Sequence, residues 1–431
     1  MADSHQATTG LAEAHDAADE VRDFSLFTPC SQAELYAKFG RMQQSCPVGR
    51  SEALGGYWVV TSNRLMAEIL RDPETYSSRI TTVPPYEDPL GPMIPIEIDP
   101  PDHTAYRKDL QRMFSPAVAN GLAEATRERA KAYVERLSSL GTAEVVGEFC
   151  EPYPAATFCL LLGVPLAALD QLLYWKNAIL HDGFGPDPEK REYVAKVVRP
   201  TVAAYFGSMV ELRREQGDDA PNDVLRALAH ARFGDRPWTE NEVLRTTHLL
   251  MSAGLDTTSA ALAMAMQYLA QHPDLQQRLK DEPEVRPNAV EEFLRLFSSI
   301  TTGRVVTRDT ELGGVQLHEG DLLNLVTPAA GRDPEDYPHP HVVDLDRGPT
   351  RHLAFGVGPH RCLGSHIARM SLTVAIEEMT ALPEYRLAEG TEPTFHPGLV
   401  LGIDDLWIEF DKPAGVAEHE DAAARVKHFV V

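Results

Sequence analysis

Apolar residues recur at helical spacing along most of the chain. This pattern predicts helices over residues 64–71, 102–114, 117–137, 153–162, 191–216, 240–271 and 287–297. Strand-like alternation is rarer: residues 57–61 alternate and end at a turn, and residues 304–307 and 315–317 flank Gly313-Gly314 in the manner of a small hairpin. Residues 327–349 are rich in Pro, Asp and Gly, which predicts an ordered meander. The pattern therefore predicts a mainly α protein with a minor β portion.

The composition fits a folded globular protein whose partners are not polyanions. Of 431 residues, 43% are hydrophobic and 24% are charged. The formal net charge of -24 argues against nucleic acid or an anionic membrane surface as a partner, because both bind basic patches. The chain shows no run of about 18 apolar residues, and its start lacks the basic and apolar segments of a secretory signal. We therefore expect a cytoplasmic protein without a membrane anchor.

One of the five cysteines lies in a glycine-rich loop near the C-terminal end. Residues 355–364 read Phe-Gly-Val-Gly-Pro-His-Arg-Cys-Leu-Gly, with the cysteine at Cys362, and lead into a helix-like run. The glycines permit positive φ and close backbone approach, so N–H groups can converge on the sulfur and a flat cofactor can lie against the loop. Haem iron suits such a site. A lone cysteine in less specific surroundings is more often a buried, inert thiol.

An acid and two hydroxyls interrupt the long apolar segment 244–269. Gly254, Asp256, Thr257 and Thr258 are poor choices for the interior of a buried helix, because glycine weakens a helix and a buried carboxylate needs a partner. A glycine beside an acid and hydroxyls can loosen the helix, admit a small ligand or water and offer hydroxyls as proton donors. The alternative is a Ser/Thr-rich helix with a satisfied buried carboxylate.

Two further pairs of charged residues share helix faces. Glu292 and Arg295 are three residues apart and can form an ion pair, although an exposed pair at this spacing is usually only solvated surface. His103 and Arg107 are one turn apart in a predicted helix that begins after two prolines, and two basic groups so placed can hold an anion. A helix-start histidine beside a surface arginine is the plainer interpretation of the second pair.

Taken together and in this order, the motifs resemble those of the cytochrome P-450 superfamily, in its soluble bacterial class. The nearest likeness is to the camphor hydroxylase type, which residues 303–309 and 314–321 echo. The resemblance covers nearly the whole chain. It implies a single cytochrome P-450 catalytic domain over residues 24–414, an α-helical prism with small β-sheets around a buried haem. Residues 1–23 and 415–431 are expected to be disordered terminal tails.

The resemblance also assigns roles to the motif residues. Cys362 would be the axial ligand of the iron of haem b. Asp256 and Thr257 would be the acid–alcohol pair that delivers protons during oxygen activation. Structural residues that hold the cysteine loop would be Glu292 and Arg295, joined by Arg347 from the meander. The residues that contact the haem would be His103, Arg107, Arg304, Phe355, Gly356, His360 and Gly364.

Positions that match the family's substrate pocket are mostly aliphatic. An apolar wall with one or two hydroxyls suits a terpenoid or another compact hydrophobe with a polar handle. Gly91 stands where camphor hydroxylase has a substrate-binding tyrosine, and Ser252 replaces an apolar residue, which argues against camphor itself. Each pocket position could equally be ordinary core. The eight positions are Met93, Ile96, Leu249, Ser252, Ala253, Ile300, Leu399 and Val400.

The resemblance therefore implies a monomeric haem-thiolate monooxygenase that uses O2 to hydroxylate a C–H bond of a small hydrophobic substrate. No flavin or nicotinamide fingerprint is present, so electrons from NAD(P)H are expected to arrive through a separate ferredoxin reductase and an iron–sulfur ferredoxin. The predicted acid–alcohol pair disfavours two alternatives, a haem-thiolate peroxygenase and a non-catalytic haem-binding sensor or carrier. Acidic ferredoxins would find a basic face at Lys108, Arg112, Arg361 and Arg369.

Overall fold

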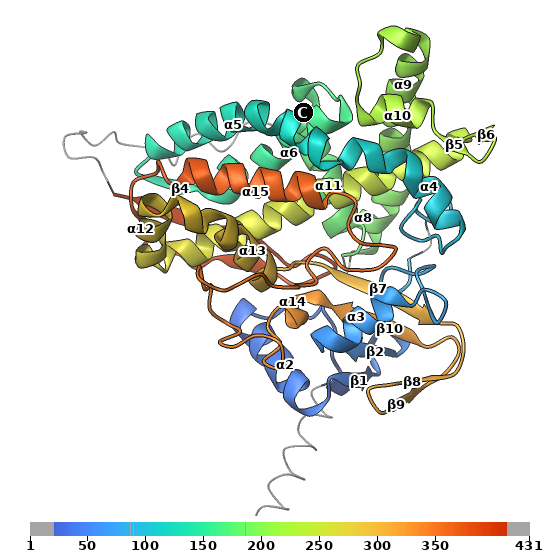
Figure 1. The fold of residues 1–431 in the computed structure, drawn as a ribbon, viewed down its shortest axis with the longest axis horizontal. Helices are drawn as coiled ribbons and strands as arrows, with labels where there is room; N and C mark the ends of the chain where they lie inside the picture. Colours follow the sequence, from blue (N-terminus) through green and yellow to red (C-terminus); the bar gives the residue numbers. More distant parts are fainter. Residues whose placement is uncertain (1–20, 87, 89, 186, 412–431) are drawn as a thin grey trace, which may run out of the picture.

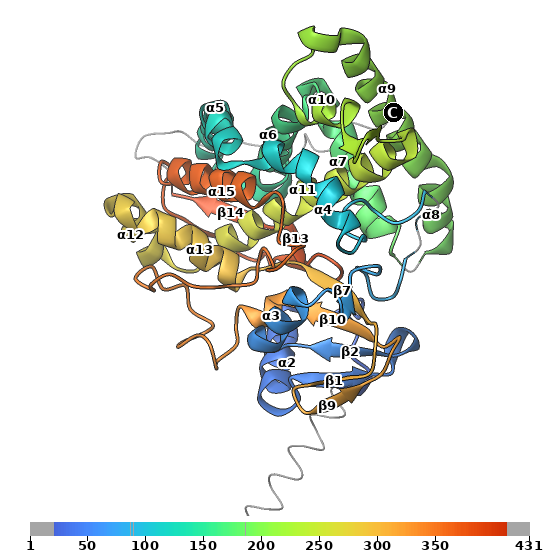
Figure 2. The same ribbon diagram turned by 45° about the vertical axis from the view of Figure 1, so that its right-hand side comes forward.

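The structure, a computed structural model, describes residues 21–411 apart from residues 87, 89 and 186. Almost all of the predicted tails, 1–23 and 415–431, lies outside the described residues. Figures 1 and 2 show the described chain as a larger helical region beside a smaller region that holds the main β-sheet. In one region long helices stack on one another, and in the smaller region α2 (Gln32–Ser45) and α3 (Asn63–Arg71) lie beside a β-sheet.

Each helix predicted from the apolar pattern is present, one of them in two parts. The predicted segment 191–216 is divided into α8 (Pro188–Tyr193) and α9 (Arg199–Gln216), which a wider, π-type turn joins. The other counterparts are α3, α4 (Asp102–Gln111), α5 (Pro116–Ser138), α6 (Pro152–Leu162), α11 (Glu240–Ala270) and α13 (Arg286–Leu296). The helix-like run after the cysteine is α15 (Ser365–Met379). Helices that the pattern did not predict are α2, α7 (Leu169–Asn177), α10 (Val224–Ala229), α12 (Pro273–Asp281) and, within the predicted meander, the short α14 (Thr327–Ala330).

The main sheet has the strand order β1-β2-β10-β7-β3, in which β2 and β10 are parallel and the other neighbours are antiparallel. Its strands are β1 (Val48–Ser51), β2 (Tyr57–Val60), β3 (Tyr76–Ser77), β7 (Thr301–Val306) and β10 (Leu322–Val326). A second sheet combines β4 (Thr142–Glu144), β14 (Trp407–Phe410) and β11 (Tyr385–Leu387). Two-stranded pairs are formed by β5 (Arg232–Phe233) with β6 (Arg236–Pro237) and by β12 (Thr394–His396) with β13 (Gly402–Asp405).

The hairpin across Gly313-Gly314 is formed by a different strand from the one predicted. The prediction paired residues 304–307 with 315–317, but β7 pairs with β10 and β3 instead. The partner of β9 (Val315–Leu317) is β8 (Thr310–Leu312). Loop length explains the error, because both glycines have positive φ and such a two-residue turn joins only the strands directly beside it.

Helix α11 runs through the middle of the helical region. It begins at a capping box formed by Thr239 and Glu242. Its first half packs with α6, α9 and α10 in one apolar cluster, and its second half packs with α5, α13 and α15 in another. The helix is long and apolar enough to cross a membrane, but 72% of its most apolar window is buried inside the protein. Burial on all sides explains why its sequence is apolar on all sides.

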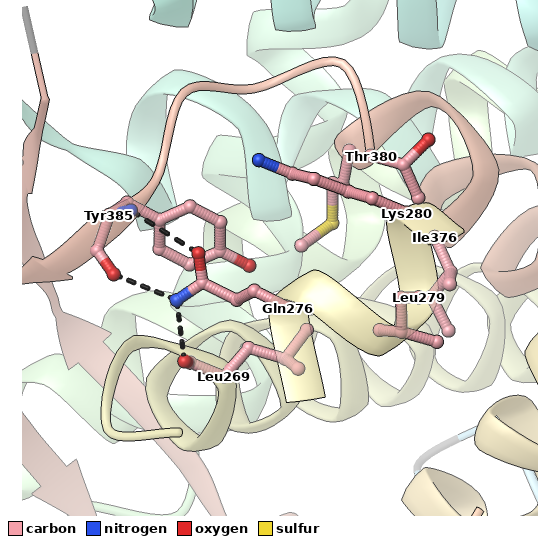
Figure 3. Close-up of a pocket in the computed structure, with 8 residues that line it drawn as sticks. Leu269, Gln276, Leu279, Lys280, Ile376, Thr380 and Tyr385 are labelled. Carbon is pink, nitrogen blue, oxygen red and sulfur yellow. Dashed lines mark hydrogen bonds between the residues drawn. The ribbon is translucent and has the colours of Figure 1, made fainter. Parts of the chain in front are cut away.

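A small pocket lies where α12 meets β11 (Figure 3). The side-chain amide of Gln276 donates to the carbonyl oxygens of Leu269 at 2.7 Å and Tyr385 at 2.8 Å, and the Tyr385 N–H donates back to Gln276 Oε1 at 3.2 Å. The volume of about 10 Å³ leaves room for at most about one water molecule. None of the predicted site residues lines this pocket. Gln276 therefore fixes α12 to the second sheet and has no place in the candidate site.

Candidate active site

Backbone contacts fix the shape of the cysteine loop and hold it against α3. The Cys362 N–H donates to the Phe355 carbonyl oxygen at 2.8 Å. Gly356 and Gly358 both have positive φ, of 60° and 77°. A Cβ at Gly358 would lie 2.2 Å from the carbonyl oxygen of Leu70 in α3. Glycine is therefore required at position 358 by its backbone conformation and by the close approach of α3.

The Cys362 thiol lies deep in the protein, yet its side chain is solvent-accessible. Burial raises the pKa of the thiol, while the Gly364 backbone N–H and the guanidinium groups of Arg107, Arg361 and Arg369 oppose that shift. The same N–H group and cations would stabilise a thiolate, and a metal ion on the sulfur would displace the thiol proton. The loop therefore suits a metal ligand better than an inert core thiol.

Four basic side chains gather beside the cysteine loop. His103 and Arg107 come from α4, Arg304 comes from β7 and His360 belongs to the loop. The ring centroids of His103 and His360 are 4.1 Å apart. Within the described part of the chain, neither ring nitrogen of His103 nor Nε2 of His360 has a hydrogen-bond partner. Buried donors of this kind are suited to a ligand that accepts hydrogen bonds.

Burial is the main cause that lowers the pKa values of these groups, and neighbouring positive charges add to it at the two histidines. Burial, followed by the charge of Arg107, lowers the pKa of His103 to about 4. Burial and the neighbouring His103, Arg304 and Arg107 lower the pKa of His360 to about 3. Burial lowers the pKa of Arg304 to about 10, although Asp99 acts in the opposite direction. A buried cluster with so little counter-charge favours an anionic ligand, and carboxylates are strong acceptors for such donors.

Glu292, Arg295 and Arg347 lie together at the end of α13. Arg295 donates two hydrogen bonds to the Glu292 carboxylate, at 2.8 and 2.9 Å, and Arg347 Nε lies 3.0 Å from Glu292 Oε2. The other three N–H groups of Arg295 donate to backbone carbonyl oxygens of Gly331 at 2.6 Å, Pro340 at 2.8 Å and Val342 at 2.8 Å. All five donors of this fully buried guanidinium are therefore used.

Sequence reasoning missed the neighbouring Glu291. It accepts hydrogen bonds from Arg369 Nε at 2.7 Å and Nη2 at 2.9 Å, and its Oε2 lies 3.0 Å from His352 Nε2. The Arg369 guanidinium also lies 4.6 Å from the centre of the Phe355 ring. These contacts join α13, α15 and the start of the cysteine loop. The sequence did contain a sign of this second cluster, namely two adjacent acids, Glu291 and Glu292. Neighbouring residues of a helix point in different directions, so the two acids meet different partners.

Replacing Glu291 with Gln should make the free energy of unfolding depend less on pH in the acidic range. Burial alone would raise the pKa of Glu291, but hydrogen bonds from His352 and Arg369 outweigh it and lower the pKa to about 2. Because the folded-state pKa lies below the ordinary value of 4.5, this stabilisation is present above pH 4.5 and is lost as the pH falls toward 2. The side chain is 34% exposed, so we expect E291Q to lose only about 1 kcal/mol at pH 7.

The measurement is the free energy of unfolding in urea at pH 7 and near pH 3. The difference between wild type and E291Q should shrink at the lower pH. E211Q is the matched control, because Glu211 pairs with Arg214 at 2.7 Å and its side chain is 58% exposed. A difference between wild type and E291Q that is equal at both pH values would contradict the assignment.

The carboxylate of Asp256 on α11 is buried and bound on one side. Lys176, a fully buried lysine on α7, donates to Asp256 Oδ1 at 2.9 Å and also pairs with Glu151. Burial would lower the pKa of Lys176, but the two carboxylates outweigh it and raise the pKa, so the ammonium stays charged. Asp256 Oδ2 has no hydrogen-bond partner among the described residues. The sequence contained one sign of this ion pair, because Lys176 lies on the apolar face of its helix.

Thr257 follows Asp256 directly, and its hydroxyl donates to the Ala253 carbonyl oxygen one turn earlier, at 3.1 Å. Ala253 is exposed and Thr257 is half-buried, although both lie in the middle of a largely buried helix. Helix α11 continues without a break through this point. Gly254 has a packing role: a Cβ there would lie 2.3 Å from the Phe158 ring of α6.

The eight predicted pocket positions come from four segments. Met93 and Ile96 precede α4, whereas Ile300 and Val400 form an isolated β-bridge between the start of β7 and the segment before β13. The Ser252 hydroxyl donates to the His248 carbonyl oxygen at 2.8 Å. Leu249 is buried, Ala253 is exposed and the remaining six positions are half-buried, in sequence order Met93, Ile96, Ser252, Ile300, Leu399 and Val400.

A buried polar cluster near these positions was not predicted. Asp88 Oδ2 lies 2.8 Å from Arg199 Nη1 and 3.1 Å from His248 Nδ1. Burial would raise the pKa of Asp88, but the hydrogen bond from His248 and its other partners lower it. Arg199 also lies over the Tyr86 ring, at 4.6 Å from its centroid. The cluster ties the segment before α4 to α9 and α11, one turn from Ser252.

Comparison with known proteins places this architecture in a family. A family model described as cytochrome P450 matches residues 179–401. A Sinorhizobium fredii protein named probable cytochrome P450 127A1 is 33% identical over 401 residues, which cover 90% of this chain and 94% of the relative. Mycinamicin IV hydroxylase/epoxidase of Micromonospora griseorubida is 31% identical, with 88% of this chain and 92% of the relative covered. The chain therefore belongs to the cytochrome P450 family, as its motifs predicted.

Solved structures confirm the predicted fold. The crystal structure of cytochrome P450 CYP101C1 matches with a TM-score of 0.81 and 28% identity, covering 91% of this chain and 98% of that one. CYP101J2 matches with the same TM-score and 24% identity. The protein is a monooxygenase of this family, and its cofactor is haem b.

The residues present fit haem b. Its two propionate carboxylates match the buried, uncompensated group of His103, Arg107, Arg304 and His360 in charge and in hydrogen-bonding capacity. The haem iron would be bound by the Cys362 sulfur, on which a backbone N–H group and guanidinium groups act.

Proposed function

We propose that this protein hydroxylates compact, mainly apolar molecules of the terpenoid kind, as a cytoplasmic monomer that receives electrons from NAD(P)H through a ferredoxin reductase and a ferredoxin. The observation that carries the proposal is the state of Asp256. One carboxylate oxygen is held by Lys176, the other has no partner in the described chain, and the Thr257 hydroxyl is adjacent in sequence. A positioned acid beside an alcohol serves proton transfer. A haem carrier has no use for such a pair.

Haem b bound through Cys362 would supply the chemistry of oxygen activation and C–H oxidation. The chain's own part begins with holding that group. The loop glycines Gly356 and Gly364 and the Phe355 ring would lie against it. The propionate carboxylates of the haem would be bound by His103, Arg107, Arg304 and His360. The cysteine loop would be held in place by Glu292, Arg295 and Arg347.

Proton delivery would fall to Asp256 and Thr257. Asp256 Oδ2 would hold a proton and pass it toward the Thr257 hydroxyl, while the Lys176 ammonium fixes Oδ1 and sets the direction of the carboxylate. Lys176 is thus a positioning residue, because it touches Asp256 and not the substrate. An ordered path for protons favours hydroxylation over release of reduced oxygen.

The proposed substrate class follows from the eight pocket positions, which are apolar apart from Ser252. The Ser252 hydroxyl already donates to the His248 carbonyl oxygen, so its lone pairs are free to accept a hydrogen bond from a substrate hydroxyl. One such acceptor in an aliphatic wall suits a compact hydrophobe with a single polar handle.

The proposed ferredoxin face is narrower than the sequence indicated. Lys108, Arg112 and Arg361 are exposed. Arg369 forms an ion pair with Glu291 and lies against Phe355, so its charge is largely neutralised within the protein. An acidic ferredoxin would therefore meet the first three residues, close to the cysteine loop.

Replacing Thr257 with Val should uncouple the reaction. With NADH, ferredoxin reductase, ferredoxin and a terpenoid chosen by its effect on the haem spectrum, product formation should fall by about 10²-fold. NADH consumption should fall less, and hydrogen peroxide should account for the difference. The measurement is the amount of product and of peroxide formed per NADH oxidised.

Ser259→Ala is the matched control. The Ser259 hydroxyl donates to the Leu255 carbonyl oxygen at 2.9 Å, the same bond that Thr257 makes, but Ser259 is buried in the core. The S259A variant should keep the wild-type yield of product. Unchanged product yield in T257V would refute the proton-delivery role, and terpenoids that leave the haem spectrum unaltered would refute the substrate class.

A further inference from the structure

Two histidines and an aspartate from distant parts of the chain meet outside the cysteine site. His181 lies in the π-type turn Ala178–Asp182 that follows α7, His396 ends β12 and Asp404 lies in β13. One ligand atom from each of the three side chains lies within 4.8 Å of the others. His396 Nδ1 and Asp404 Oδ1 are 2.7 Å apart. The three groups therefore converge although more than 200 residues separate His181 from His396.

The two imidazole rings are arranged as ligands rather than as a stack. Their centroids are 4.9 Å apart and their planes are nearly perpendicular, at 87°. Among the described residues, neither ring nitrogen of His396 has a partner in hydrogen-bonding geometry, although Nδ1 is close to Asp404. Burial is the main cause that lowers the pKa of His181, so its ring is neutral near pH 7 and keeps a free lone pair.

The absence of a side chain at Gly402 leaves space for the His396 ring. Gly402 is the register partner of His396 across β12 and β13, and a Cβ on Gly402 would lie 2.5 Å from Cε1 and 2.8 Å from Nε2 of His396. Any other residue at position 402 would displace the His396 ring. Asp404 is exposed while both histidines are half-buried, so the cluster opens to solvent on the carboxylate side.

The charges nearby permit a cation. Lys176 is a positive charge that acts on His181, but two carboxylates, Glu151 and Asp256, already pair with it. Asp256 acts on His181 in the direction that favours positive charge, as does Asp404. A divalent ion at the cluster would therefore meet net negative surroundings.

We propose that His181, His396 and Asp404 form a binding site for Zn²⁺ or a similar divalent transition-metal ion. Two imidazole nitrogens and one carboxylate oxygen are a common zinc ligand set, with water in the fourth position. Zinc bonds of about 2.0–2.1 Å place tetrahedral ligands about 3.3 Å apart, so small side-chain rotations close the observed spacing. Mg²⁺ and Ca²⁺ require mainly oxygen ligands and do not suit two imidazoles.

Metal binding would tie the segment after α7 to the hairpin of β12 and β13. Leu399 and Val400, two of the pocket positions, lie between those strands. The bound ion would thus act on the hairpin that carries two of the proposed pocket positions. The metal site itself requires no part of the proposed function.

The test is titration of the chelator-treated holoprotein with ZnCl₂ in a calorimeter. We expect one Zn²⁺ per chain and a rise in the thermal unfolding midpoint when Zn²⁺ is added, since a ligand of the folded state stabilises it. Loss of an outer-shell partner alone weakens metal binding by about 10–100-fold, so H396Q and D404N should lose at least that much. Asp404 is exposed, so D404N keeps the test decisive where H396Q fails to fold.

The matched control is H318Q. His318 also lies beside an aspartate, with His318 Nδ1 3.4 Å from Asp309 Oδ1 on the exposed hairpin of β8 and β9, but it belongs to no cluster of three ligands found among the described residues. H318Q should bind Zn²⁺ like the wild type. Absence of Zn²⁺ binding to the wild type, or equal binding by D404N and the wild type, would overturn the proposal.

Discussion

Replacing Cys362 with Ala should abolish the red-shifted absorption band of the reduced, CO-bound protein and reduce hydroxylation below detection. That band reports a thiolate on the iron, and Cys362 is the cysteine in the loop that the basic side chains surround. Without the thiolate, the electron density that favours O–O cleavage is lost. The measurement is the difference spectrum of the dithionite-reduced protein with and without CO.

Cys46→Ala is the control for this experiment. Cys46 is also a free cysteine, but it is half-buried at the end of α2 and its thiol lies 3.5 Å from the Val48 carbonyl oxygen. C46A should keep the red-shifted band. A red-shifted band that persists in C362A would show that another residue holds the iron, and the cysteine-loop assignment would be wrong.

Replacing Arg295 with Met should destabilise the fold by about 3–5 kcal/mol, because it leaves Glu292 buried with one partner fewer and removes three donors from backbone carbonyls. The meander would lose its main-chain contacts with Arg295 of α13. We therefore expect R295M to unfold at lower urea and to retain less haem. The measurement is the urea midpoint together with the haem content of the purified variant.

Arg214→Met is the matched control, because Arg214 and Glu211 form an ion pair with the same three-residue spacing at 2.7 Å. That pair is exposed, at 34% and 58% of the two side chains. We expect R214M to change stability by no more than about 0.5 kcal/mol. Equal urea midpoints for the two variants would show that burial adds nothing to the Arg295 pair.

Features that depend on short stretches of sequence were predicted well. The helices follow from apolar spacing within about 10 to 30 residues, and the shape of the cysteine loop follows from glycines at fixed positions within it. The hairpin of β8 and β9 was wrong in one strand because three residues, Thr310 to Leu312, carry too little alternation to be recognised. The two-residue turn at Gly313-Gly314 contained the information that would have corrected it.

Features that depend on residues far apart in the chain were not predictable from one sequence. Lys176 binds Asp256 across 80 positions, and Glu291 binds Arg369 across 78. Each of these residues on its own indicates only that a buried or half-buried charge needs a partner. The partner is set by how α7, α11, α13 and α15 pack, which no local pattern records. The same holds for the meeting of His181 with His396.

The hydrogen bonds of Arg295 bear on how this protein tolerates mutation. The guanidinium binds the meander through main-chain oxygens at Pro340 and Val342, and the Val342 side chain is 50% exposed. Carbonyl oxygens are common to all residue types, so the contact constrains the path of the backbone and leaves the side chains at these positions free to vary. Over evolutionary time the meander can therefore diverge in sequence while the path of its backbone around Arg295 stays the same.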